Sequence, residues 1–270
     1  MKRALYALAL SITFFSCQQK EITKTYIPRI LTANEKFNDP QELMDSAFSI
    51  VRIVDEKRAG TIEDPKEWFS IKRGDTTVRV QMNPTDTASA TADFANAVYI
   101  NTQKTTILAQ IKDESGLTAP FFLITLKDGI TEAVQLYRPS KGGPDEKAMG
   151  LYRVGRDGYL INQDFFVTNV NAKVYLMKRQ NPDQRINGQF FMMSPDKETI
   201  VFMMPDAKLY QIHYSTGETH SEPLGISPDD EGLYTHVQTG FSWTKTKRGI
   251  SFLKKNDDNR IVDISEFKKK

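Results

Sequence analysis

The chain has 270 residues, of which 36 are Lys or Arg and 34 are Asp or Glu, so its charges nearly balance. A balanced chain lacks the basic face that nucleic-acid binding needs, and nucleic acid is therefore excluded as a partner. The single cysteine allows no internal disulfide, so the core has to hold by packing alone.

Residues 1–16 have the order of a secretory signal peptide. Lys2 and Arg3 form a cationic end, residues 4–15 are apolar apart from two hydroxyl residues, and a small residue precedes Cys17. The apolar run is about a dozen residues long, whereas a permanent membrane helix needs roughly 20. We therefore expect this segment to be removed on export rather than retained as a membrane span.

The segment Phe14-Phe15-Ser16-Cys17 resembles the lipobox of bacterial lipoproteins. Ser16 supplies the small residue before the cysteine, whereas Phe14 and Phe15 depart from the usual Leu and small residue. The polar stretch after Cys17 is similar to that of Bacteroidetes lipoproteins. The resemblance implies a diacylglycerol thioether on Cys17 and an acylated N-terminus, and several lipid chains on one residue anchor a protein lastingly. It implies an outer-membrane location, on the periplasmic side or at the cell surface.

A tether and a short helix are expected after the cysteine. Residues 17–38 are mostly polar and predict a lipidated tether between membrane and domain. In the helix, Asp39 fits the N-cap, Pro40 the first turn and Glu42 the capping box. The apolar stripe of this helix is expected to consist of Leu43, Met44, Ala47 and Phe48.

From residue 50 onward, short apolar runs separated by turn residues predict the strands of an antiparallel β protein. Residues 50–54 form the first such run. Residues 74–75, 128–129 and 157–158 are Gly-Asp or Asp-Gly pairs, which tolerate the positive φ of tight hairpin turns. Another hairpin is expected around residues 194–197.

The fold class that follows is mainly β, with antiparallel sandwich or barrel-like sheets over residues 39–270 and one short N-terminal helix. Residues 83–92 are rich in Pro, Thr, Ser and Ala, and they predict a loop or a boundary that splits this region. Residues 193–212 and 241–263 resemble consecutive blades of a β-propeller. A small propeller is therefore the alternative, although it needs at least four such units.

The three histidines of the chain all fall within one stretch, as His213, His220 and His236. Imidazoles that converge from different strands could hold zinc or copper, so these residues are the candidate metal ligands. None of their spacings places two of them on one helix turn or one strand face, and convergence would depend on folding. His213 alternates with apolar neighbours and also fits a solvent-facing strand position. No other cofactor is indicated.

The sequence carries no recognised catalytic motif. It lacks the nucleophile elbow, the P-loop and the zinc-protease helix motif, and Cys17 is committed to lipid. Trp68 and Trp243 could stack on sugar rings or belong to the core. We therefore expect a non-catalytic binding or scaffold module for a protein or a glycan, attached to the membrane through Cys17. The alternative is an exported hydrolase that uses paired carboxylates.

Overall fold

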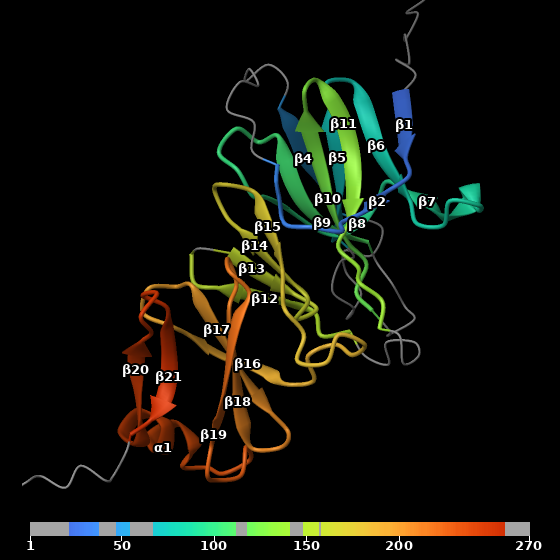
Figure 1. The fold of residues 1–270 in the computed structure, drawn as a ribbon. Coiled ribbons are helices and arrows are strands. Elements are labelled where there is room, and N and C mark those ends of the chain that lie inside the picture. The colour runs from blue at the N-terminus through green and yellow to red at the C-terminus, as the bar shows by residue number, and fades with distance from the viewer. Residues whose placement is uncertain are drawn as a thin grey trace, which may run out of the picture.

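The computed structural model describes residues 22–37, 47–54, 67–111, 118–140, 148–156 and 158–256. Within these ranges the regular structure is mostly β, with one α-helix, and the strands form four sheets. Figure 1 shows the sheets as successive layers, the first of them strongly curled. The mainly β class with antiparallel, barrel-like sheets is confirmed. Across the same ranges, no helix is long and apolar enough to cross a membrane.

The first sheet has ten strands, in the order β1-β6-β5-β8-β9-β10-β11-β2, with β4 paired to β5 and β7 paired to β6. Its strands are β1 (Ile22–Tyr26), β2 (Arg29–Ile30), β4 (Phe48–Val54), β5 (Glu67–Arg73), β6 (Thr76–Gln81), β7 (Ala90–Thr91), β8 (Phe94–Tyr99), β9 (Thr106–Ile111), β10 (Phe121–Lys127) and β11 (Ile130–Gln135). The 3-10 turn Thr87–Ser89 precedes β7.

The other sheets follow in chain order. The second sheet contains β12 (Leu151–Val154), β13 (Gly158–Ile161), β14 (Phe165–Thr168), β15 (Lys173–Leu176) and β3 (Glu35–Lys36). The third contains β16 (Gln189–Met193), β17 (Thr199–Met204), β18 (Lys208–His213) and β19 (Glu218–Pro223). The fourth contains β20 (Phe241–Lys245) and β21 (Ser251–Lys255), which follow helix α1 (Leu233–Gly240).

The N-terminal strands bring the two edges of the first sheet together. β1 pairs in parallel with β6 at one edge, and β2 pairs in parallel with β11 at the other. Between β1 and β2 stand Ile27 and Pro28, and because Pro has no backbone N–H, the ladder stops here and the chain crosses between edges. β3 then pairs with β15 of the second sheet. We call residues 22–36 the strap.

Apolar cores lie inside the curl and between each pair of neighbouring layers. The curled sheet encloses one core, and its outer face packs on the second sheet to form another. β10 contributes to both, with Ile124 in the first core and Leu123 in the second. A strand buried on both faces has no polar positions to alternate, which explains the unbroken apolar run of residues 121–126. Further cores join the second sheet to the third, and the third to α1 and the fourth.

The predicted hairpins are confirmed, with one difference of detail. The turns at residues 74–75, 128–129 and 194–197 each join antiparallel strands. β12 and β13 also pair as expected, but Gly158 is the first residue of β13 rather than part of the turn. An ideal Cβ on Gly158 would lie 2.5 Å from the carbonyl oxygen of Val167, so glycine is needed here for close strand packing.

The N-terminal expectations need correction. Residues 22–37, expected in the tether of residues 17–38, belong to the folded part because Leu31 and Phe37 are buried in the core between the first two sheets. The helix start at residue 39 lies outside the described residues. Phe48, expected on that helix, instead begins β4, where it and Ile50 pack toward the core inside the curl with the period of two typical of a strand.

Two further expectations differ from the structure. Residues 83–92 do not separate two domains, because β6 before them and β8 after them belong to the same sheet. Of the blade-like stretches, residues 193–212 fall within the four-stranded meander β16–β19, whereas the second stretch contributes only β20 and β21 to the described residues. In the part of the chain that the structure describes, β12–β15 form one further four-stranded meander, which is fewer units than a closed propeller needs.

Candidate functional site

The turn between β13 and β14 places three polar side chains inside the molecule. Asn162, Gln163 and Asp164 are all buried, although hairpin turns normally lie on the surface. The backbone N–H of Asp164 donates to the carbonyl of Ile161 at 2.9 Å, and φ is 48° at Asn162 and 56° at Gln163. These angles are typical of a type I′ turn, whose twist matches that of the flanking strands. The turn therefore places the carboxylate of Asp164 in the interior of the protein.

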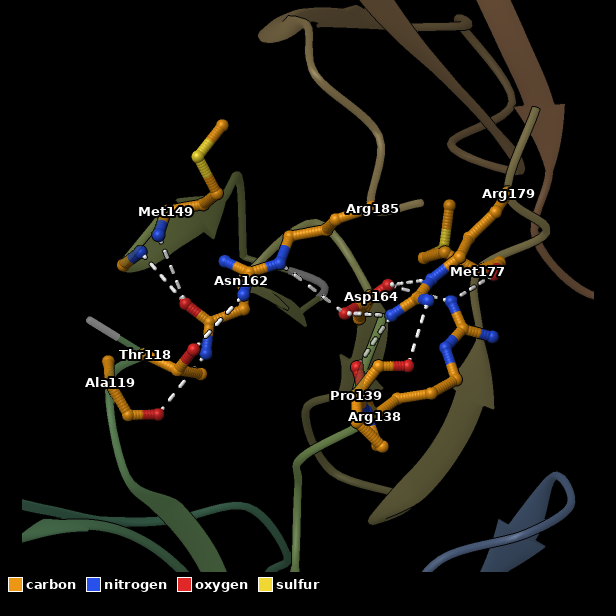
Figure 2. A network of polar contacts seen from close by, with 11 residues as sticks. Thr118, Ala119, Arg138, Pro139, Met149, Asn162, Asp164, Met177, Arg179 and Arg185 are labelled. Atoms are coloured by element: carbon orange, nitrogen blue, oxygen red, sulfur yellow. Dashed lines mark hydrogen bonds and ion pairs between the residues drawn. The ribbon is translucent and has the colours of Figure 1, made fainter. Parts of the chain in front are cut away.

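Three arginines surround the carboxylate of Asp164 (Figure 2). Its Oδ1 accepts hydrogen bonds from Arg179 Nε at 2.9 Å and Arg138 Nη2 at 2.7 Å, and its Oδ2 accepts one from Arg179 Nη2 at 2.9 Å. Arg185 Nε lies 3.8 Å from Oδ2. The side chains of Asp164 and Arg179 are only 3% and 4% exposed, so water screens their attraction little.

The same arginines also hold main-chain segments in place. Arg138 Nη2 donates to the carbonyl of Met177 at 2.6 Å. Arg179 donates to the carbonyls of Arg138 at 2.6 Å and Pro139 at 3.2 Å. Residues 138–139 follow the first sheet, whereas residues 177–179 lead from the second sheet toward the third. The ion pairs thus fix the connections between layers.

Asn162 extends this network to the loops before β10 and β12. Its Oδ1 accepts hydrogen bonds from the backbone N–H groups of residues 149–150 at 3.2 and 3.1 Å, and its Nδ2 donates to the carbonyl of Ala119 at 3.2 Å. Next to Ala119, the hydroxyl of Thr118 accepts a hydrogen bond from Arg185 Nη2 at 3.1 Å. We call Asp164, its three arginines and Asn162 the Asp164 cluster.

The chemistry of the Asp164 cluster is that of a structural junction. Both oxygens of Asp164 accept charge-assisted hydrogen bonds, which are roughly twice as strong as neutral ones. A general base needs a free lone pair within reach of a substrate proton, and this carboxylate offers its lone pairs to arginines instead. The cluster therefore stabilises the arrangement of the layers rather than performing proton transfer.

Sequence reasoning did not single out any member of the Asp164 cluster. The sequence feature that points to the cluster is the polar turn between two apolar strands, residues 158–161 and 165–168. The arginine partners of Asp164 could not be predicted from the sequence, because Arg179 and Arg138 stand 15 and 26 positions from Asp164 and no local periodicity relates them.

Each of the three candidate metal ligands contacts a different group of the protein. Nδ1 of His213 lies 2.9 Å from the hydroxyl of Thr216 in the next turn. Nε2 of His220 lies 2.9 Å from a carboxylate oxygen of Glu222, and His236 donates from Nε2 to a main-chain carbonyl at 2.8 Å. Over the described ranges, no group of three His, Cys, Asp or Glu side chains could hold a metal ion. Cys17 lies outside these ranges.

Aromatic side chains gather along the edge strands of the middle layers. The rings of Tyr152 in β12 and Phe190 in β16 have centroids 6.1 Å apart, and those of Phe191 and Tyr234 in α1 are 5.3 Å apart. The register of β16 shifts at Phe191, so this residue is a β-bulge that turns its ring toward α1. Tyr234 is 63% exposed and Tyr152 is also exposed. We call these four residues the aromatic row.

The tryptophans considered as sugar platforms take other positions. Trp243 in β20 packs, partly buried, against the core between the third and fourth sheets, and Trp68 lies in β5 opposite Ile53. Neither belongs to the aromatic row. Comparison with protein-family models, curated proteins and solved structures finds no match for the chain.

Proposed function

We propose that the protein is an exported lipoprotein that works as a non-catalytic binding or scaffold module for a protein or a glycan. Lipid on Cys17 holds it to the membrane. The sequence before this cysteine supports export, and the first strand supports close attachment. Ile22 begins β1 five positions after Cys17, and five residues span at most about 17 Å. The first sheet therefore stands next to the lipid anchor.

The orientation of the layers follows from this attachment. β1 starts at one end of the molecule, and the fourth sheet with α1 lies at the opposite end (Figure 1). A module anchored at Cys17 thus presents its third and fourth sheets away from the membrane. The Asp164 cluster and the interlayer cores hold these layers to the first sheet.

The observation that carries the binding role is the aromatic row. Aromatic rings that are rigid and partly exposed supply large contact area at a low cost in conformational entropy, and they bind both proteins and sugar rings. The row crosses from β12 through β16 to α1, so it draws on three consecutive layers. Its two ring pairs lie on opposite sides of the third sheet, since Phe190 packs against the core toward the second sheet and Phe191 against the core toward α1. The exposed rings of Tyr152 and Tyr234 are the parts of the row that a partner can reach.

Photocrosslinking in intact cells tests the binding role. A photoreactive phenylalanine in place of Tyr234 should give discrete adducts, because this position lies in the proposed contact. The matched control places the same group at Arg52, an exposed residue of β4 in the first sheet. Adducts specific to position 234 support the proposal, whereas identical patterns, or none at either position, contradict a binding role for the aromatic row.

Membrane fractionation tests the anchoring role. The wild type should sediment with membranes, and Cys17→Ala should become soluble or stay unprocessed. Ser11→Ala, which alters the apolar run but keeps the cysteine, is the control and should behave as the wild type. Membrane association of Cys17→Ala at the wild-type level would contradict the anchor.

A further inference from the structure

The start of β1 shares one end of the first sheet with two tight turns. Ile22 pairs with Thr76, which directly follows the turn at residues 74–75. At the same turn, Arg73 Nη1 donates to the carbonyl of Gly129 at 3.1 Å, in the turn between β10 and β11. Figure 1 shows the β10–β11 turn and the start of β1 at the same end of the sheet. We call Ile22 and the turns at residues 74–75 and 128–130 the N-terminal rim.

Two large apolar side chains project from this rim. Ile130 is 69% exposed, the highest value among the large hydrophobic residues described, and Ile22 is 59% exposed. Isolated exposed apolar residues are common on soluble proteins, so exposure alone indicates no partner. What distinguishes this pair is its place, because Ile22 begins the folded part five positions after the cysteine proposed to carry lipid.

Charge on the rim does not select a particular headgroup. Lys104 lies at this end, since its carbonyl accepts a hydrogen bond from the N–H of Phe48 opposite Arg73, and Lys127 precedes the β10–β11 turn. Asp75 and Asp128 stand in the turns themselves. Arg73 is a third cation at the rim, whereas Lys127 Nζ lies 3.7 Å from Glu35 Oε1, so the positive and negative charges are close to balanced. We therefore assign any contact with lipid to the apolar side chains.

We propose that the N-terminal rim rests on the leaflet that holds the lipid of Cys17, with Ile22 and Ile130 in the headgroup region. This inference rests on the proposed lipid anchor. A span of at most about 17 Å between lipid and β1 keeps the rim within reach of the interface, where apolar side chains enter about 5–10 Å. The contact fixes the tilt of the layers relative to the bilayer.

Single-thiol variants of the full lipidated protein test this contact. Because Cys17 is the only cysteine and is blocked by lipid in the proposed form, a new cysteine takes up one thiol-reactive fluorophore. Ile130→Cys reports the rim, and Tyr234→Cys, with similar exposure at the distal end, is the control. The variants are placed in vesicles of phosphatidylcholine and phosphatidylethanolamine that contain a doxyl-lipid quencher. We expect about twofold or greater quenching at position 130 relative to position 234.

A second reporter position is needed because Ile130→Cys itself removes one of the two proposed contact residues. Asp75→Cys leaves both isoleucines in place and should also be quenched more than the control at position 234. Adding Ile22→Glu and Ile130→Glu should reduce quenching at position 75 to the control level, because charged side chains leave the headgroup region. Equal quenching at positions 75, 130 and 234 would overturn the rim contact.

Flotation of the same vesicles distinguishes failure of the rim contact from failure of the proposed lipid anchor on Cys17. Wild-type protein that floats with lipid, combined with equal quenching at all positions, overturns the rim contact and leaves the anchor intact. Wild-type protein that fails to float overturns the anchor and the rim contact together. Flotation with stronger quenching at the rim supports both.

Discussion

Arg29 in the strap binds Glu132 in β11 through two parallel hydrogen bonds, of 2.8 and 3.0 Å. Arg29 also donates to Glu35 at 2.8 Å, and its guanidinium lies over the ring of Phe37. One side chain therefore joins β2, β11 and β3. The strap holds the two edges of the curled sheet together and attaches them to the second sheet.

Removing this arginine should loosen the strap. We predict that Arg29→Ala lowers the free energy of unfolding by about 1–2 kcal/mol, because a bidentate pair within a network stabilises more than an isolated surface pair. Urea unfolding followed by tryptophan fluorescence measures the change. Arg52→Ala, which removes the exposed pair with Glu67, is the control and should cost less than about 1 kcal/mol. Equal losses would contradict a special role for Arg29.

Neutralising Asp164 should destabilise the protein severely. Asp164→Asn leaves three guanidinium groups around a neutral amide, two of them almost fully buried, and breaking a buried pair typically costs about 3–5 kcal/mol. The matched control is Asp206→Asn, which removes an exposed pair with Lys208 and should change the free energy of unfolding by less than about 1 kcal/mol. A loss at Asp164 as small as that control would show that the cluster is not a structural junction.

Gly158 should not tolerate a methyl group. Its Cβ would meet the carbonyl of Val167 at 2.5 Å and the ring of Phe166 at 2.8 Å, so Gly158→Ala should cost about 1–3 kcal/mol through overpacking. Gly240→Ala is the control, since its Cβ would meet no atom closer than 4.0 Å. A smaller cost at position 158 than at position 240, in thermal or urea unfolding, would argue against this close strand packing.

We predict that ionisation of Tyr210 lowers the stability of the folded protein at alkaline pH. Burial raises the pKa of Tyr210 to about 12, and its hydroxyl donates to the carbonyl of Lys178 at 3.0 Å. Because the pKa is higher in the folded state than its ordinary value of about 10, this contribution is complete below pH 10 and is lost as pH rises toward 12. Tyr210→Phe should cost about 1 kcal/mol at neutral pH and flatten the pH dependence of unfolding in that window. An unchanged profile would contradict the assignment.

We predict that protonation of Asp196 lowers the stability of the folded protein at acidic pH. Partial burial raises its pKa, but hydrogen bonds from the hydroxyls of Ser194 and Ser251 outweigh this and lower the pKa below its ordinary value. Its contribution to stability is therefore present above about pH 4 and is lost as pH falls through the lower pKa of the folded state. Asp196→Asn should reduce the loss of stability in acid, which urea unfolding at stepwise lower pH would measure.

Local patterns predicted much of the fold, and the reasons for the failures are physical. Turn residues such as Asp128 and Gly129 mark hairpins because the conformation they adopt is set within a few residues. The strap was missed because its strands are short and polar, and only pairing with β6 and β11, distant in sequence, makes them strands. Helix α1 was missed because its β-branched and His residues are weak helix formers, and burial of Leu233 and Val237 on one face stabilises it.

The candidate sites also differ in whether they depend on a local sequence pattern or on contacts between layers. The expected export signal before Cys17 depends only on the order of charge, apolarity and small residues along the chain, and it lies outside the described residues. The Asp164 cluster and the aromatic row depend on contacts between layers, for which a single sequence gives no spacing rule. The three histidines are close in sequence, but each contacts a different group: a hydroxyl at His213, a carboxylate at His220 and a main-chain carbonyl at His236.

Mass spectrometry of the N-terminus of wild-type protein purified from membranes tests the central claim most directly. Lipid attachment predicts an N-terminal peptide that begins at Cys17 and carries the mass of a diacylglycerol thioether and an added acyl chain. A peptide with an unmodified Cys17, or one that still contains residues 1–16, would contradict the anchor and the orientation derived from it.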